Sequence, residues 1–63
     1  MSTAIAEIDY DEAWETLAVR FTDGKLYKYW NVPLDVYVEF LYAPSSGEYF
    51  NAKIRNNYSY REG

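Results

Sequence analysis

The chain has 63 residues, a formal net charge of -4, and neither cysteine nor histidine. A chain this short forms at most one domain and buries only about 60% of the surface that its unfolded form exposes. Disulfide bonds and the usual zinc sites of small domains are excluded, because both need thiol or imidazole groups. Packing of the eight tyrosines, three phenylalanines and two tryptophans must therefore stabilise a single domain over residues 1–63.

The charge is distributed unevenly. Residues 1–15 hold five acids and no base, so residues 16–63 carry a net charge of +1. An acidic chain is a poor non-specific ligand for nucleic acid, but a local basic patch could still bind one. The start of the chain lacks the basic and apolar regions of a signal peptide, and no apolar run approaches the roughly 18–20 residues of a membrane span. We therefore expect a cytoplasmic protein with no membrane partner.

Three strands are predicted, over about residues 4–10, 15–21 and 25–31. The first, within AIAEIDY, alternates between apolar and polar residues and would place on one face Ala4, Ala6, Ile8 and Tyr10. The second and third flank the strongest hairpin signal in the chain, the TDG of residues 22–24.

The length of that hairpin loop decides where Tyr27 and Tyr29 point, because a shift of one residue moves every side chain to the other face. A two-residue turn would place Lys28 among apolar side chains. A three-residue loop with Gly24 left-handed at a bulge gives a cleaner apolar face. It pairs Leu17 with Tyr29, Val19 with Tyr27 and Phe21 with Lys25. We prefer this register, which makes both tyrosines core-facing.

The same register places Leu26, Lys28 and Trp30 on the opposite face of the sheet. An exposed tryptophan and leucine there suggest a surface for a partner protein or a homodimer seam. Packing by the N-terminal residues or by the tail would be the structural alternative.

Two short helices are predicted, over about residues 33–43 and 46–55. Pro33 suits a first helical turn and Pro44 ends the first helix, whose apolar spacing is set by Val36, Tyr37, Phe40 and Leu41. Ser45 and Glu48 form a capping box for the second helix, from which the inward side chains would be Tyr49, Phe50 and Ile54. Asn56 and Asn57 suit a left-handed helix stop, and residues 56–63 an extended tail. The predicted fold class is α+β, a three-stranded antiparallel meander followed by two helices on one face.

Catalysis has little support in the sequence, because acid–base and nucleophilic chemistry would have to use carboxylates, lysine or tyrosine alone. Asp9, Asp11 and Glu12 could bind a hard cation, but a solvated turn is the preferred interpretation, since calcium loops need a fuller set of oxygen ligands. An anion at the amides of residues 45–47 would compete with the Glu48 carboxylate, so capping is preferred there too. We expect a non-enzymatic protein without cofactor or metal.

The segment YFNAKIRNNYSYR, residues 49–61, is the best candidate for a binding site, because it combines aromatic rings with three bases and no acid. Base–aromatic stacking contributes about 1–3 kcal/mol per base, and arginine can bind phosphate or stack. The candidate ligand-binding residues are Asn51, Lys53, Arg55, Tyr58, Tyr60 and Arg61. As the structural alternative, the aromatic rings close the core while Lys53 and Arg55 pair with the acidic first strand.

The order of residues in GKLYKYWNVP and VYVEFLYAPSSGEYFNAKIRNNYSY resembles the KTSC domain family. The resemblance covers nearly the whole chain and includes the Tyr27-x-Tyr29 signature, followed by Val32-Pro33, Ala43-Pro44-Ser45, Gly47, Tyr49-Phe50-Asn51, Ile54-Arg55 and Tyr58. The family is named from its occurrence at the C-terminus of some lysyl-tRNA synthetases and also occurs as stand-alone bacterial or phage proteins. The resemblance implies a candidate for RNA binding, because of this attachment to a tRNA-charging enzyme. Ser46, Glu48 and Ala52 stand where relatives tend to carry lysine, which weakens the phosphate-binding case.

Two functions are therefore weighed. The first is a non-enzymatic binding module that binds RNA, single-stranded nucleic acid or a nucleotide through the segment 49–61. The second is a protein-interaction module, such as a phage accessory protein acting on a host protein, that uses the acidic first strand or the face around Trp30.

Overall fold

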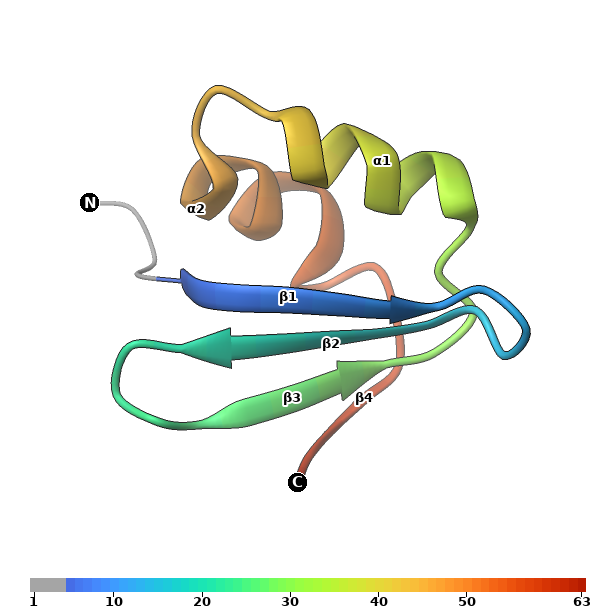
Figure 1. Cartoon of the computed structure of the whole chain (residues 1–63), viewed down its shortest axis with the longest axis horizontal. Coiled ribbons are helices and arrows are strands. Elements are labelled where there is room, and N and C mark those ends of the chain that lie inside the picture. The colour runs from blue at the N-terminus through green and yellow to red at the C-terminus, as the bar shows by residue number, and fades with distance from the viewer. Residues whose placement is uncertain (1–4) are drawn as a thin grey trace.

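The computed structural model describes residues 5–63 as a four-stranded antiparallel sheet with all helices on one of its faces (Figure 1). The elements in chain order are β1 (Ile5–Asp11), β2 (Thr16–Phe21), β3 (Leu26–Tyr29), α1 (Leu34–Tyr42), α2 (Ser46–Tyr49), η1 (Phe50–Ile54) and β4 (Tyr60–Glu62). The strands follow one another across the sheet in the order β1-β2-β3-β4. The predicted α+β class, with the meander first and the helices on one face, is confirmed.

The fourth strand was not predicted. Residues 56–63 were expected to be an extended tail, but Tyr60–Glu62 pairs with β3 and places Tyr60 opposite Tyr29 and Arg61 opposite Lys28. A three-residue strand is too short to show a periodic pattern, so only the exposed edge of β3 could have indicated it. Because side chains alternate along a strand, β4 contributes Tyr60 to one face of the sheet and Arg61 to the other.

The predicted hairpin register is confirmed. Leu17 pairs with Tyr29 and Val19 with Tyr27. The Phe21 amide donates to the Lys25 carbonyl and the Gly24 amide to the Phe21 carbonyl, both at 2.9 Å. Gly24 has a φ of 93°, a left-handed conformation that glycine adopts without strain.

The predicted inner face of β1 is partly wrong. Ile5 pairs with Phe21 but Glu7 pairs with Arg20, so the register shifts by one residue between them. Ala6 is exposed and Ile5 packs against the core in its place. A bulge of this kind leaves one extra residue unpaired and reverses the alternation, which simple periodicity does not reveal. Ile8 and Tyr10 pack against the core as predicted, whereas Ala4 lies outside the described residues.

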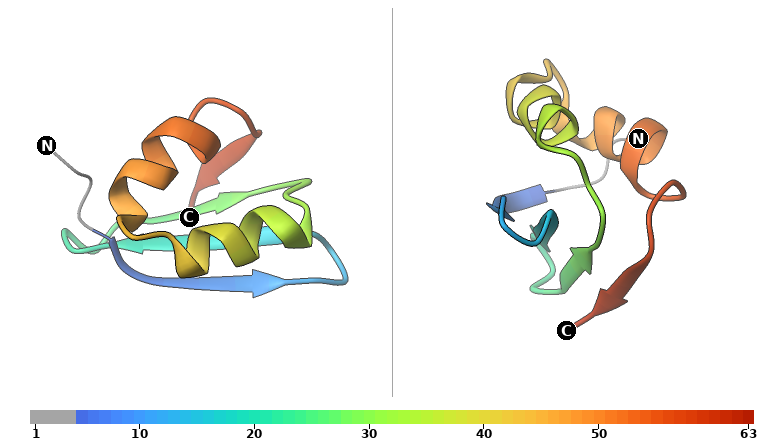
Figure 2. Two further views of the ribbon diagram at one scale, coloured as in Figure 1. Left: turned by 90° about the horizontal axis from the view of Figure 1, so that it is seen from above. Right: turned by 90° about the vertical axis from the view of Figure 1, so that its right-hand side faces the viewer.

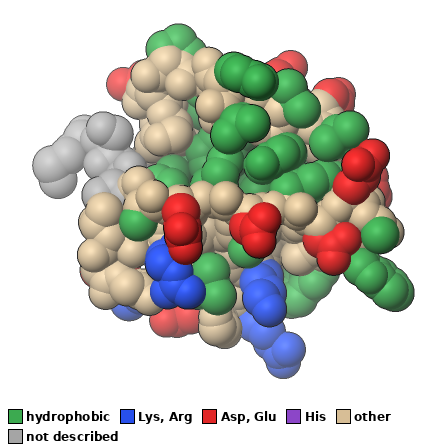
Figure 3. All heavy atoms as spheres, in the orientation of Figure 1, with side chains coloured by type: hydrophobic (Ala, Val, Ile, Leu, Met, Phe, Trp, Pro, Cys, Tyr) green, Lys and Arg blue, Asp and Glu red, His purple; other side chains and the backbone are tan. Residues whose placement is uncertain are grey.

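Helix α1 follows Pro33 at its N-cap and ends before Pro44, as predicted. Its inner side chains are Val36, Tyr37 and Phe40. Leu41 does not complete this face, because 48% of its surface is exposed. It belongs instead to an exposed apolar stripe whose members are Leu34, Val38, Leu41 and Tyr42, and green side chains along α1 are visible in Figure 3.

The second helical segment starts at the predicted cap, where the Ser45 hydroxyl accepts a hydrogen bond of 3.3 Å from the Glu48 amide. After α2 the segment continues as a π-helix, η1, in which the Arg55 amide donates to the Phe50 carbonyl at 2.9 Å. The predicted left-handed stop is wrong. Within residues 5–63 the non-glycine residues with positive φ are Glu15 and Asn31, and the segment instead leaves η1 through turns at 55–57.

The two views of Figure 2 show the helices over one face of the sheet, and the core lies between the two layers. Its buried members are Leu17, Val19, Tyr29, Val32, Phe40, Phe50 and Ile54. Phe50 and Ile54 therefore face inward as predicted, and Tyr49 packs beside them. Among the helices of residues 5–63, none is long and apolar enough to cross a membrane.

Candidate ligand-binding pocket

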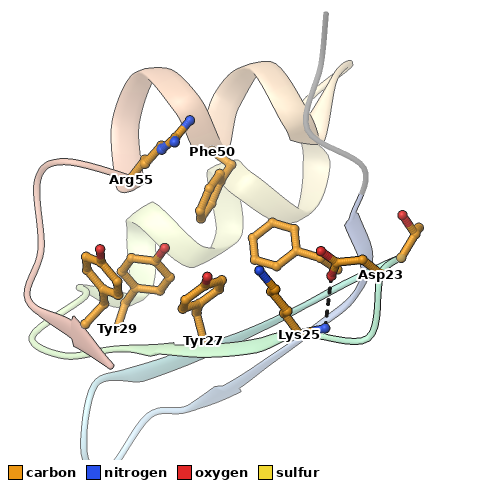
Figure 4. Close-up of a pocket in the computed structure, with 9 residues that line it drawn as sticks. Asp23, Lys25, Tyr27, Tyr29, Phe50 and Arg55 are labelled. Atoms are coloured by element: carbon orange, nitrogen blue, oxygen red, sulfur yellow. Dashed lines mark hydrogen bonds between the residues drawn. The ribbon is translucent and has the colours of Figure 1, made fainter. Parts of the chain in front are cut away.

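A pocket of about 430 Å³ lies between the β2–β3 hairpin, β4 and the helical segment η1. We call it the aromatic pocket; its lining residues are Phe21, Thr22, Asp23, Lys25, Tyr27, Tyr29, Phe50, Arg55 and Tyr60. In Figure 4 Tyr27 and Tyr29 rise from the sheet, Phe50 and Arg55 come from the helical segment opposite, and Lys25 and Asp23 lie at the hairpin end. Five of the nine residues lie on strands or in η1, Arg55 directly follows η1, and three belong to the hairpin loop.

The strand register brings three tyrosines together in this pocket. Tyr27 and Tyr29 are two residues apart on β3 and therefore share a face, and Tyr60 lies opposite Tyr29 across the β3–β4 pair. The Tyr60 ring is 5.3 Å from that of Tyr29 and 5.7 Å from that of Tyr27, centroid to centroid. Phe21 meets Tyr27 edge to face at 5.5 Å. The result is a continuous aromatic surface.

The π-helical turn places Phe50 and Arg55 in the same pocket. In an α-helix with 3.6 residues per turn, two residues five positions apart point about 140° away from each other. The wider turn of η1, closed by the bond from the Arg55 amide to the Phe50 carbonyl, brings Arg55 back over Phe50. Phe50 is buried at the base of the pocket, whereas Arg55 is exposed at its opening.

The hydroxyl groups of Tyr27, Tyr29 and Tyr60 form no hydrogen bond within residues 5–63, whereas those of Tyr10 and Tyr49 do. Burial, together with the neighbouring Tyr60 and Tyr27, raises the pKa of Tyr29 to about 12, and Arg55 opposes the shift. All three tyrosines and Arg55 line the aromatic pocket. A tyrosine hydroxyl can both donate a hydrogen bond to a ligand and accept one from it.

The formal charge of the pocket is +1 in a chain of net charge -4, because Lys25 and Arg55 outnumber Asp23. The Asp23 carboxylate accepts a hydrogen bond of 3.0 Å from the backbone amide of Lys25, which fixes the loop. The Arg55 guanidinium donates to the side-chain oxygen of Asn51 at 3.5 Å. Arginine has five N–H donors, so this bond leaves others for an anion.

The structure separates the six predicted ligand-binding residues. Arg55 and Tyr60 line the aromatic pocket, and Asn51 supports Arg55 from within η1. Lys53 is exposed outside the pocket. Tyr58 is partly buried against the core. Arg61 lies on the other face of the sheet, opposite Lys28.

Arg55 does not pair with the first strand, the structural role weighed for it above. In residues 5–63 the ion pair of β1 is formed by Glu7 and Arg20, whose charged atoms are 3.5 Å apart. Sequence reasoning assigned both tyrosines of the signature to the core and therefore missed the contribution of Tyr27 to the pocket. It also missed Lys25. Tyr29 is indeed a core residue, with 3% of its surface exposed, but it also lines the wall of the pocket. The available signal was the spacing of Tyr27 and Tyr29, which places both rings on one face of β3, together with a further tyrosine, Tyr60, in the C-terminal segment.

A second hollow, of about 1120 Å³, lies on the face of the sheet opposite the helices. We call it the outer groove; its lining residues are Asp9, Tyr10, Asp11, Glu12, Ala13, Trp14, Thr16, Ala18, Lys28, Trp30, Arg61 and Gly63. Lys28 and Trp30, predicted as part of a partner surface, line it. Leu26 points to the same face of β3 but does not line the groove.

The acidic residues of β1 and the following turn do not form a metal centre. Within residues 5–63 no group of three or more acidic, histidine or cysteine residues is arranged to hold a metal ion. The Asp11 carboxylate instead accepts hydrogen bonds from the amides of Ala13, at 3.1 Å, and Trp14, at 3.4 Å. It therefore orders the turn between β1 and β2.

This arrangement defines a small α+β domain with an aromatic, cationic pocket on one side of its sheet. The sequence model of the KTSC domain family matches residues 1–58, and the chain belongs to that family. In the solved structures, a KTSC domain protein of Yersinia pestis is similar, with a TM-score of 0.91, 30% sequence identity, and coverage of 100% of this chain and 89% of that one.

Relatives of two kinds are similar in sequence. A protein of Tsukamurella paurometabola is 41% identical over 54 residues, which are 86% of this chain and 81% of that protein. A lysine-tRNA ligase of Trichormus variabilis is 38% identical over 58 residues, which are 92% of this chain but 10% of the ligase. The chain therefore spans about a tenth of the length of that ligase. The domain occurs both as nearly a whole protein and as a small part of a larger enzyme.

Proposed function

We propose that this KTSC domain is a non-enzymatic module that binds a nucleotide unit, either free or within single-stranded RNA, in the aromatic pocket. The observation that carries the proposal is that Tyr27, Tyr29 and Tyr60, whose hydroxyls form no hydrogen bond within residues 5–63, line one pocket together with Arg55. The pocket volume of about 430 Å³ falls within the range of about 300–1,000 Å³ usual for small-molecule sites.

The aromatic surface provides the contact with a base. Tyr27 and Tyr60 are less buried than Tyr29, so their rings offer a face or an edge to a flat ligand ring. Stacking of this kind is tolerant of sequence because every base has a π-face. The hydroxyls can donate to base nitrogens, carbonyl oxygens or a ribose hydroxyl.

Arg55 and Lys25 provide the contact with phosphate. They come from opposite sides of the pocket, η1 and the hairpin, so an anion at the opening can meet a planar fork of donors from one and an ammonium group from the other. Asp23 partly offsets this charge. The expected affinity is therefore modest and sensitive to salt.

The relatives give supporting context. The matching segment in proteins named lysine-tRNA ligase accounts for about a tenth of their length. A module attached to an enzyme that acts on tRNA is consistent with a role near RNA, although an attachment is an association rather than a mechanism.

The proposal is tested by NMR titration of the labelled protein with AMP, UMP and single-stranded RNA trimers at low salt. We expect amide shifts at Tyr27, Arg55 and Tyr60, and their loss on Arg55→Gln. Lys53→Gln is the matched control, because Lys53 lies on the same helical segment outside the pocket. Binding of trimers without mononucleotides would identify RNA as the source of the nucleotide. If neither shifts the pocket amides, the proposal fails.

A protein-interaction role is the second candidate function, favoured by the exposed tryptophans of the outer groove. Trp14 is 77% exposed, and Trp30 lines the same groove. Exposed tryptophan is enriched at protein interfaces. Because the groove and the aromatic pocket lie on opposite faces of the sheet, the two functions can be tested separately. A pull-down with the tagged domain tests this one: recovery of a partner that Trp30→Ser abolishes would support it, and recovery of none would count against it.

A further inference from the structure

Charges of opposite sign lie on the two sides of the outer groove. Strand pairing sets four residues in one row across the sheet, one on each strand: Asp9, Ala18, Lys28 and Arg61. Asp11 and Glu12 extend the acidic side of the groove along β1 and its turn. In Figure 3 acidic side chains follow β1, with basic side chains beside them. The groove therefore has an acidic side at β1, a basic side at β3 and β4, and the small Ala18 between.

These charges are not neutralised by other residues of the segment 5–63. Lys28 and Arg61 face each other across the β3–β4 pair, an arrangement of like charges that is unfavourable in a sheet. Neither forms an ion pair within residues 5–63. Asp9 lies three strand spacings from Arg61, about 14 Å, which is too far for direct contact. Both sides of the groove thus remain available to a partner.

Two copies of the groove are complementary in charge when they are related by one particular two-fold rotation. A two-fold axis parallel to the strands reverses the strand order of a second copy, so that β1 of one chain faces β4 of the other. Asp9 then lies opposite Arg61 of the second copy, and this contact occurs twice because a two-fold interface is self-complementary. A two-fold axis perpendicular to the strands would instead place β1 opposite β1 of the second copy, so that acidic residues would face acidic residues.

The same operation also matches shapes. It places β3 of one copy over β2 of the other, so that Trp30 faces the row of small side chains formed by Thr16 and Ala18. Sheets pack face to face about 10 Å apart, which leaves room for one layer of interdigitated side chains. Trp14, at the end of the groove, would gain contacts that the single chain does not offer it.

We propose that the outer groove is the interface of a two-fold symmetric homodimer, packed sheet to sheet with the strands aligned. A nucleic acid strand fits this groove less well, because it would meet three carboxylates. The exposed stripe on α1 is a weaker seam for self-association, because Asp35 and Glu39 lie on that helix and it carries no base.

The experiment is sedimentation velocity at low salt on Asp9→Arg, on Arg61→Glu, and on an equimolar mixture of the two. Each variant alone places like charges in both Asp9–Arg61 contacts of its own dimer, so we expect roughly tenfold weaker association, equivalent to about 1.4 kcal/mol. In the mixed dimer both contacts again join opposite charges. We therefore expect the mixture to recover the dimer of the unaltered protein, as the double variant should.

Leu41→Lys is the control on the α1 stripe and should leave the dimer intact. Arg55→Gln, in the aromatic pocket, should also leave it intact, so that the failure of the nucleotide proposal and of the dimer would be distinguishable. The proposal is overturned if the unaltered protein is monomeric at every concentration studied, if the mixture fails to recover the dimer, or if Leu41→Lys disrupts it.

Discussion

The ring of Tyr10, on β1, stacks on the ring of Tyr37, on α1, with centroids 4.7 Å apart and planes inclined by 8°. The Tyr10 hydroxyl also donates to the carbonyl of Val32, a buried residue in the connection between β3 and α1. One side chain therefore joins the edge strand to both the helix and the segment that precedes it.

Tyr10→Phe should keep the stack but lose this hydrogen bond. Because the Val32 carbonyl would lose a partner in a partly buried place, we expect the free energy of unfolding to fall by about 1 kcal/mol. In a domain of this size that corresponds to a loss of about 4–8 °C in Tm. Urea and thermal denaturation measure both quantities. Tyr42→Phe, at a tyrosine that is 78% exposed, is the control and should leave stability unchanged.

Stability should decrease at alkaline pH. Burial raises the pKa of Tyr29 to about 12, and burial together with the hydrogen bond to Glu39 raises that of Tyr49 to about 12, against 10.0 for an unperturbed tyrosine. Between pH 10 and 12 the folded state therefore holds more protons than the unfolded state. The contribution of Tyr29 and Tyr49 to stability is complete below pH 10 and is lost as the pH rises toward 12. Urea denaturation at a series of pH values checks this, and equal stability at pH 8 and pH 11.5 would contradict it. Tyr49→Phe should make the loss shallower.

Gly24→Ala should destabilise the hairpin through the backbone alone. The φ of Gly24 is 93°, and no atom lies within 4 Å of the position that a Cβ would occupy. An L-alanine there costs about 1–2 kcal/mol for its left-handed conformation. A D-alanine, introduced by chemical synthesis, adopts this conformation readily and should stabilise the domain by about 0.4–1 kcal/mol through the unfolded state. A similar effect of both enantiomers on urea denaturation would show that the cost is steric instead.

Tyr60→Ala should impair ligand binding more than folding. Tyr60 is 56% exposed and contributes its ring to the aromatic pocket. If a base stacks there, its removal should weaken nucleotide binding by about 1–3 kcal/mol. Isothermal titration calorimetry gives the affinity, and thermal denaturation gives the stability. Unchanged affinity would show that the base does not stack on Tyr60.

The sequence predicted those parts of the fold that depend on local pattern and loop chemistry. The Gly24 loop fixed the register of β2 and β3, and the proline and serine signals marked the helix starts. The bulge at Ala6 and the pairing of β4 depend on contacts between distant segments, which no local pattern records. Leu41 was misplaced because α1 has apolar residues on two sides.

The candidate site was harder to predict than the fold. Arg55 and Tyr60 were identified from composition, but Arg61 was grouped with them although alternation along β4 sends it to the opposite face. Tyr27 and Tyr29 were assigned to the core by the same hairpin register that also opens them to the pocket. Whether a tyrosine ends in a core or in a cavity depends on the segments across from it, here β4 and η1.

The short length of β4 has a consequence for the motions of the domain. It is held by pairing with β3 alone, and all three of its residues are exposed. Such a strand detaches at a lower free energy than global unfolding requires. The release of β4 would remove Tyr60 from the aromatic pocket and Arg61 from the outer groove at the same time. Protection of the β4 amides from hydrogen exchange would therefore report the occupancy of both faces of the sheet.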